Sequence, residues 1–350
     1  MGSDVTLSAM KSWLVVAPPP VGPFDGIAEF SRGLAAAINA VEPAKLVFSH
    51  AGLAEGAETK GIFLQYYPNA FVTPGLPALL SHMSRLRARG VPIVTTIHEY
   101  WPPASSSLKR AVWRTLCKQT LKAVAARSSH VVTTTPYAAG HLQRAGIAPA
   151  AKFSVIPVPS NIPAIAASSH AGGQPALVMF GQPYVLDRAI VLALARWIEA
   201  QSPRPRWIWI ARSVAEMKKF WSEIGAPDVI EMHGELPAAD VSALIAQGSI
   251  GLGVYDDGVS TRRTTLTALL AHGLPIVGLD GRYTDDRLRQ SGAFVLSPLL
   301  EGPAFIANVQ RVMNDDALRS WLASAAARLH ASEFTWPRVA AQYLVAAKQK

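Results

Sequence analysis

The strongest constraint on the fold is a repeated alternation of short apolar segments with longer amphipathic segments. Residues 13–17 and 92–97 are short and apolar, which is typical of strands buried on both faces of a sheet. Residues 27–40 instead carry apolar side chains such as Phe30 and Leu34 at the spacing of one helix face. Strands and helices that alternate in this way predict an α/β protein with parallel sheets covered by helices.

The alternation occurs twice along the chain. Residues 162–175, rich in alanine, serine, glycine and proline, separate the two halves and have the composition of a linker. A chain of 350 residues is also long enough for about two domains. We therefore expect an N-terminal domain over residues 1–163 and a C-terminal domain over residues 164–334.

Composition excludes several classes of protein. Cys117 is the only cysteine, so the chain has no internal disulfide and no cysteine-based zinc site. No apolar run approaches the ~20 residues that a membrane-spanning helix needs. The first apolar segment, residues 13–17, is too short for a signal peptide, and we expect a cytoplasmic protein.

Positive charge is concentrated in one part of the chain. The formal net charge is +9, and residues 81–128 hold nine basic residues against the single acidic Glu99. Four of these basic residues recur at intervals of four and predict one stripe along a helix: Arg110, Arg114, Lys118 and Lys122. The stripe predicts contact with an anionic membrane surface, unless it is simply the solvated face of a helix packed on its own domain. We expect no nucleic-acid partner, because the sequence has no RNA-binding aromatic signature, zinc finger or basic tail.

Residues 258–277 predict a loop, a helix and a tight turn into a buried strand. Thr264 or Thr265 is expected to cap this helix. Arg262 and Arg263 come just before the helix N-terminus, where free amides and the helix dipole favour an anion. The stretch therefore predicts a phosphate or diphosphate site, the alternative being an ordinary capped helix with two solvated arginines.

Several further segments form a pattern when taken in order. They are the glycine-containing loop 26–28, the strand end 95–99, the strands 131–135 and 155–160, the loop 233–237, the segment 271–277 and the closing turn 334–336. Together these segments resemble glycosyltransferase family four, whose members use nucleotide-sugar donors with retention of configuration.

This resemblance implies the GT-B fold, in which two Rossmann-like domains face a cleft. Residues 1–163 would form the acceptor-side domain and residues 164–334 the donor domain, and the helix of residues 335–350 would pack back on the N-terminal domain. The resemblance also implies no cofactor and no metal, and the sequence contains no Asp-x-Asp motif.

The chain departs from the family at two positions. The family usually carries a pair of glutamates, which hold the donor sugar and the ribose, and Ser260 and Ala268 stand in their places. The loop between them is similar to a Ser-x-Arg-Arg-x-Thr variant of the family, in which arginines hold part of the donor. We therefore expect Arg262 and Arg263, together with the strand-end His98, to be the catalytic residues. A core or capping histidine is the alternative for His98.

The remaining site predictions concern the two substrates. The residues expected to bind the donor are Gly26, Gly181, Arg188, Leu236, Ser260, Thr264 and Thr265. Asp25 and Glu99 are expected near the acceptor, the alternatives being a turn aspartate and an ion-pair partner of the basic helix. Asp256 and Asp257 are either loop residues or donor contacts.

We expect a hexosyltransferase-like enzyme that moves a sugar from a nucleotide-sugar donor to a lipid-linked or glycan acceptor. Its setting would be bacterial-type polysaccharide or glycolipid synthesis, with the enzyme peripheral on the inner face of the membrane. Two alternatives stay open. One is a catalytically silent binding or assembly subunit with the GT-B fold, and the other is a GT-B nucleotide-sugar epimerase or hydrolase.

Overall fold

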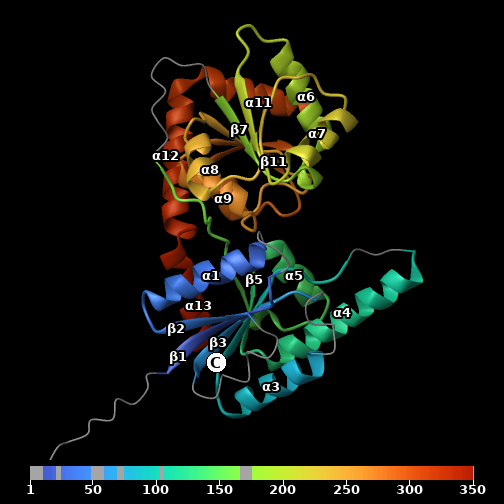
Figure 1. Ribbon diagram of the computed structural model, residues 1–350, viewed down its shortest axis with the longest axis vertical. Helices are drawn as coiled ribbons and strands as arrows, with labels where there is room; N and C mark the ends of the chain where they lie inside the picture. Colours follow the sequence, from blue (N-terminus) through green and yellow to red (C-terminus); the bar gives the residue numbers. More distant parts are fainter. Residues whose placement is uncertain are drawn as a thin grey trace, which may run out of the picture. The chain divides into compact units, whose positions relative to one another are not determined.

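The computed structural model describes residues 11–20, 25–48, 59–68, 75–102, 106–165 and 176–349. The chain forms two compact units (Figure 1). Unit 1 comprises Met1–Pro157 with Trp336–Lys350, and unit 2 comprises Val158–Thr335. The division therefore falls after Pro157, whereas the sequence suggested a boundary at residue 163.

Unit 1 is built on a parallel sheet whose described strands follow the order β2-β1-β3-β4-β5-β6. The strands are β1 (Ser12–Ala17), β2 (Ala44–Phe48), β3 (Thr59–Tyr66), β4 (Ile93–Ile97), β5 (His130–Thr133) and β6 (Phe153–Val155). The helices are α1 (Gly26–Asn39), α3 (Leu76–Ala88), α4 (Leu108–Arg127), α5 (Pro136–Arg144) and α13 (Trp336–Lys348), with a 3-10 turn at Ala150–Lys152.

Aromatic residues hold the C-terminal helix α13 in unit 1, although the rest of that unit comes from the first half of the chain. The Tyr343 ring lies edge-on to Phe63 of β3 at 5.6 Å, and its hydroxyl hydrogen-bonds Thr96 of β4 at 2.8 Å. The Trp336 ring fills the space beside Gly33, where an added Cβ would lie 2.2 Å from a ring carbon. Helices α1 and α13 therefore approach closely only because residue 33 is a glycine.

Unit 2 has a second parallel sheet, in the order β12-β11-β10-β7-β8-β9. Its strands are β7 (Ala176–Phe180), β8 (Arg206–Ile210), β9 (Glu231–His233), β10 (Ile250–Gly253), β11 (Ile276–Asp280) and β12 (Phe294–Pro298). Its helices are α6 (Arg188–Glu199), α7 (Val214–Glu223), α8 (Ala238–Ile245), α9 (Thr264–Ala271), α10 (Asp286–Gln290), α11 (Gly302–Asn314) and α12 (Asp316–Glu333), with a 3-10 turn at Pro183–Val185.

Both sheets confirm the α/β prediction. Central strands such as β1 and β7 are buried along nearly their whole length, which explains their continuous apolar sequences. In a parallel sheet the carboxyl ends of neighbouring strands meet at one edge, where ligands usually bind. Among the described residues, no helix combines the length and hydropathy needed to cross a membrane.

Candidate functional site

Two arginines and one aspartate form an ion-paired cluster at the carboxyl edge of the unit 2 sheet. Asp257 follows β10, and both Arg262 and Arg263 donate to its carboxylate, one to each oxygen. The Asp257 and Arg263 side chains are 7% and 11% exposed, whereas that of Arg262 is 35% exposed. Arg263 is therefore the inner cation of the cluster and Arg262 the outer one.

Each guanidinium group also lies on a tyrosine ring. The Arg262 guanidinium carbon is 4.1 Å from the centroid of Tyr283, and that of Arg263 is 4.2 Å from the centroid of Tyr255. An arginine over an aromatic face is stabilised by the electron-rich ring and loses part of its freedom to rotate. The two guanidinium groups are thus held in place before any ligand arrives. We call Tyr255, Asp257, Arg262, Arg263 and Tyr283 the arginine cluster.

Tyr255 joins three segments of unit 2 around this cluster. Its buried hydroxyl donates to the carbonyl oxygen of Phe180 at 3.1 Å, at the end of β7. Since that bond uses its one hydrogen, Thr265 of α9 donates to the Tyr255 oxygen at 3.0 Å. Burial raises the pKa of Tyr255, although Arg263 and the Thr265 hydrogen bond oppose this shift. The phenol therefore stays neutral and fixes α9 against the ends of two strands.

Backbone packing fixes the position of Asp257. The next residue, Gly258, has a φ of +90°, which side-chain-bearing residues rarely adopt. An added Cβ there would lie 2.4 Å from the Gly281 nitrogen, and the Tyr283 amide donates to the Asp257 carbonyl at 3.2 Å. The loops after β10 and β11 are therefore locked together, with the arginine cluster between them.

The N-terminus of α9 lies directly beside the arginines. The helix begins at Thr264 with Arg263 in the capping position, and no side chain caps it. The prediction that Thr264 or Thr265 caps the helix is therefore wrong, because both threonines lie inside the first turn and Thr265 bonds Tyr255 instead. The first amides of the helix keep their capacity to bind an anion.

Further polar atoms around the cluster lack hydrogen-bond partners within the described protein. They are the buried Ser260 hydroxyl and the Nε atoms of Arg262 and Arg263. A buried polar atom without a partner loses about 1–3 kcal/mol unless a ligand or water satisfies it. With two guanidinium groups and one carboxylate, the cluster has an excess of one positive charge. The arrangement suits an oxyanion with several acceptor oxygens.

The sequence analysis did not identify the two tyrosines, and for Asp257 it left two alternatives, a loop residue or a donor contact. A signal was nevertheless present, because Asp257 and Tyr283 follow β10 and β11, which are adjacent parallel strands. Polar and aromatic residues after neighbouring strands of such a sheet come to the same edge. The order of the strands was needed to use this signal.

The other predicted donor residues of unit 2 lie in different surroundings. Gly181 packs beside the cluster, and an added Cβ would lie 3.3 Å from a ring carbon of Tyr255. Arg188 instead contacts α7: it forms an ion pair with Glu223 at 2.5 Å, and its guanidinium carbon lies 5.2 Å from the centroid of Phe220. Leu236, just before α8, is 36% exposed.

His98 lies in unit 1 at the end of β4, as the sequence predicts. Its Nε2 hydrogen-bonds the Oε1 of the buried Gln65 at 2.9 Å, and its ring lies edge-on to Phe30 at 5.5 Å. Burial lowers the pKa of His98 to about 4, and the carboxylate of Asp25 opposes this shift. The imidazole is therefore neutral at pH 7, where it can donate or accept a hydrogen bond but supplies no positive charge.

Replacing His98 with glutamine should reduce the pH dependence of stability. The native imidazole takes up its proton near pH 4 and the unfolded one near 6.5. Between these values the unfolded chain binds more protons than the folded one. The contribution of the neutral His98 to the free energy of unfolding is therefore complete above pH 6.5 and is lost as the pH falls. When the pH is lowered from 7.5 to 5, we expect the free energy of unfolding, measured with urea, to fall by about 2 kcal/mol more in the wild type than in His98→Gln. Parallel pH profiles would contradict the burial of a neutral His98.

Of the other residues predicted for the site in unit 1, Asp25 has a structural role. Asp25 caps α1 by accepting hydrogen bonds from the amides of Ile27 and Ala28 at 2.9 and 3.1 Å. An added Cβ at Gly26, the first residue of α1, would meet no atom of the described residues within 4 Å. Glu99, directly after His98, is exposed. In the described ranges, no group of three or more His, Cys, Asp or Glu side chains is arranged to hold a metal ion.

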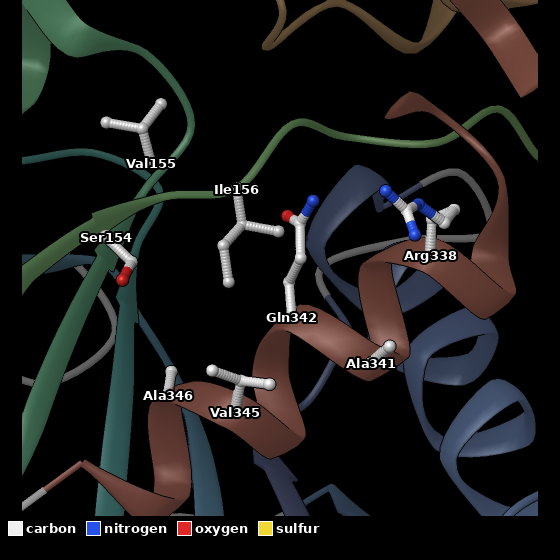
Figure 2. Close-up of a pocket in the computed structure, with 8 residues that line it drawn as sticks. All are labelled: Ser154, Val155, Ile156, Arg338, Ala341, Gln342, Val345 and Ala346. Atoms are coloured by element: carbon white, nitrogen blue, oxygen red, sulfur yellow. The ribbon is translucent and has the colours of Figure 1, made fainter. Parts of the chain in front are cut away.

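A cavity of about 360 Å³ lies between β6 and α13 of unit 1. Ile156, Ala341 and Val345 give it aliphatic walls, and Figure 2 shows Gln342 extending from α13 toward Ile156. Arg338 also lines it, and the Gln342 Oε1 is buried without a partner in the described protein. The volume is at the lower end of the range for small-ligand sites. None of the residues predicted to act in the site lines this cavity.

Comparison with known proteins supports the GT-B fold that the sequence resemblance implies. Residues 59–159 match the model of Glycosyltransferase Family 4. The sucrose-phosphate synthase of Thermosynechococcus elongatus superposes with a TM-score of 0.70 at 13% identity, covering 97% of this chain and 99% of that one. HepE of Anabaena, solved in complex with UDP, gives a TM-score of 0.69 at 14% identity, covering 96% and 99%. It has also been solved with UDP-glucose.

The same fold is found in an enzyme of a different class. A putative UDP-N-acetylglucosamine 2-epimerase of Listeria monocytogenes gives a TM-score of 0.57 at 11% identity, covering 97% of this chain and 96% of that one. No protein with a curated description matches the sequence. The chain therefore has the GT-B fold of glycosyltransferases, and the resemblance to glycosyltransferase family four is confirmed.

Proposed function

We propose that the protein transfers a sugar from a nucleotide-sugar donor and that the arginine cluster holds the donor diphosphate. The observation that carries this proposal is the position of Arg262 and Arg263, fixed on tyrosine rings directly before the uncapped N-terminus of α9. Guanidinium groups and helix amides together form a strong site for a diphosphate. The complexes of HepE with UDP and UDP-glucose add support, because that protein shares the fold.

Charge development explains how the cluster would promote the reaction. When the bond between the sugar and the diphosphate breaks, negative charge grows on the departing diphosphate oxygens. Fixed positive groups stabilise this charge without having to reorganise during the reaction. Arg263, as the inner cation, and the first amides of α9 would contribute most to stabilising the diphosphate. Arg262 would contact it from the more exposed side. The acceptor hydroxyl would attack on the face that the diphosphate leaves and pass its proton to a departing diphosphate oxygen. This attack retains the configuration, and no metal would be needed.

Asp257 offers a physical reason for the unusual loop. Ser260 and Ala268 stand where the family carries its glutamates, but Asp257 brings a carboxylate to the arginines from the end of β10. We assign it a positioning role, since it orients both guanidinium groups and reduces the positive charge of the cluster. Ser260, with its unpartnered buried hydroxyl, and the amides of Thr264 and Thr265 complete the proposed donor site.

The other proposed contacts concern the rest of the donor and the acceptor. Gly181, beside Tyr255, would let a ligand approach the backbone at the end of β7. His98, neutral and held by Gln65, would hydrogen-bond the donor sugar or the acceptor. The acceptor is proposed to be lipid-linked or glycan, in bacterial-type polysaccharide or glycolipid synthesis at the inner face of the membrane.

Two alternatives rest on specific observations. A catalytically silent subunit is favoured by the missing glutamates and by Asp257, which already occupies one oxyanion position between the arginines. A nucleotide-sugar epimerase or hydrolase is favoured by the epimerase that shares the fold. The three functions differ in their products.

A panel of nucleotide-sugars tests the proposal. The melting temperature should rise with at least one of the uridine, guanosine, adenosine, cytidine and thymidine diphosphate sugars, because a ligand that binds only the folded state stabilises it. Mass spectrometry of the stabilising donor, incubated with lipid-linked and glycan acceptors, should then show a transferred sugar. Stabilisation by none of the donors would favour the silent subunit. Epimerised or hydrolysed sugar without transfer would favour the alternative enzyme.

A further inference from the structure

Three large aliphatic side chains are exposed along one line of α4 in unit 1. Leu108 is 78% exposed, Val112 is 60% exposed and Leu116 is 44% exposed. Their spacing of four residues places them above one another on a single helix face. We call these three residues the apolar ridge. An aligned row of this kind is uncommon on a water-facing surface, whereas single exposed aliphatic residues are ordinary.

The opposite face of α4 anchors the helix in unit 1. Cys117, Leu121 and Val124 are completely buried, and Leu121 and Val124 belong to the core that also includes Leu79 and Met83 of α3. In Figure 1 the N-terminal end of α4, which carries the ridge, projects beyond the other helices of unit 1. The apolar ridge therefore belongs to a helix that is held in place by the packing of its buried face.

Only positive charges accompany the ridge on this helix. The segment Leu108–Arg127 contains no acidic residue, and Lys109, Arg110 and Lys122 are exposed. Arg114 and Lys118 are partly buried, and each lies with its charged group 5.9 Å from the ring centroid of Trp101. Arg114 also donates to the carbonyl oxygen of Pro102 at 2.6 Å. The face of the apolar ridge thus carries Lys109 and Lys122, whereas Arg110 lies on the side of the buried Cys117 and Leu121. The four basic residues of the expected stripe are therefore not presented equally.

We propose that the apolar ridge inserts into the interfacial region of an anionic lipid bilayer, while Lys109 and Lys122, which flank it, contact lipid phosphates. A narrow aliphatic row flanked by lysines is the pattern of helices that lie in the plane of a membrane surface. Anionic lipid supplies the opposite charge that the helix itself lacks. The inference does not depend on sugar transfer, since binding to vesicles is measured without donor or acceptor.

Charge favours a bilayer over a second copy of the chain. Two copies that met through the apolar ridge would bring two basic surfaces together, and like charges in contact oppose association. A lipid surface has no such penalty. Because its charge is spread over many headgroups, it can also match the separate positions of Lys109 and Lys122.

Sedimentation with vesicles tests the proposal on the full chain. We expect binding to vesicles that mix phosphatidylcholine with phosphatidylglycerol, and little binding to phosphatidylcholine alone. The triple variant Leu108→Ser, Val112→Ser, Leu116→Ser should lower the partition coefficient at least about tenfold. The double variant Lys109→Gln, Lys122→Gln should weaken binding and make it less dependent on salt. The control Val345→Ser, which removes an aliphatic side chain of 58% exposure from α13, should bind like the wild type.

A fluorescent label identifies which residues enter the bilayer. An environment-sensitive probe attached in a Val112→Cys variant should shift to shorter wavelength with anionic vesicles, and the native Cys117 is buried. Several results would overturn the proposal: equal binding to both kinds of vesicle, unchanged binding of the folded triple variant, or no spectral shift. Sedimentation equilibrium that shows a wild-type oligomer dissociated by the triple variant would instead assign the ridge to contact between copies.

Discussion

Arg263→Ala is expected to lower kcat/KM for the nucleotide-sugar donor by about 100- to 1000-fold. Arg263 is the less exposed of the two arginines and directly precedes α9, so its removal takes the inner positive charge from the proposed diphosphate site. The stabilisation lost should be greatest in the transition state, where the leaving diphosphate gains charge. The loss should therefore be mainly in kcat, with a smaller change in donor affinity.

Two further variants make the Arg263 prediction specific. Arg263→Lys keeps the charge but not the planar fork, and it should recover only part of the activity. Arg206→Ala removes another arginine of unit 2, one that pairs with Glu231 at the amino ends of β8 and β9, the sheet edge opposite the cluster, and its kcat/KM should match that of the wild type. Steady-state kinetics with circular dichroism of each variant gives the answer. Full activity in a folded Arg263→Ala protein would remove Arg263 from the catalytic machinery.

Gly258→Ala should destabilise unit 2 by about 3 kcal/mol or more. Residue 258 has a φ of +90°, and the added methyl group would lie 2.4 Å from the Gly281 nitrogen and 2.5 Å from the Thr284 hydroxyl oxygen. Both the backbone strain and the collision oppose the native conformation. Because Asp257 is the preceding residue, the shift that relieves the collision should also disturb the two arginines.

Gly225→Ala is the matched control for this prediction. Gly225 also has a positive φ, of +62°, but an added Cβ meets nothing within 4 Å. Only the conformational strain remains, so we expect the free energy of unfolding to fall by about 1 kcal/mol. Urea unfolding of both variants, with donor affinity measured in parallel, separates the two effects. Equal destabilisation by the two substitutions would contradict the close packing of the loops after β10 and β11.

The sequence was sufficient to predict the two parallel sheets, because strand and helix periodicities are local. Residues 92–97 read as a buried strand and form β4, and residues 27–40 read as an amphipathic helix and form most of α1. The helix after Arg262 and Arg263 was also expected, and α9 begins at Thr264. Each of these features follows from the order of residues within a few turns or strands.

Contacts between distant segments were not predictable in the same way. The pairing of Asp257 with both arginines depends on a loop between β10 and α9, and the ring under Arg262 comes from Tyr283 after the next strand. Likewise, the spacing of four in α4 does not reveal that Arg114 and Lys118 turn toward Trp101, or that Leu108 is exposed. Such contacts require the order of the strands and the direction of each side chain.

The most direct test of the arginine cluster is an affinity series measured by calorimetry. For the base identified by the donor panel, we predict that the nucleoside diphosphate binds at least about 100-fold more tightly than the nucleoside, because we propose that two guanidinium groups and the α9 amides contact the phosphates. In the folded double variant Arg262→Ala, Arg263→Ala, most of this difference should disappear, while affinity for the nucleoside stays unchanged. A nucleoside that binds wild type as tightly as its diphosphate, or a double variant that keeps the full difference, would contradict the account.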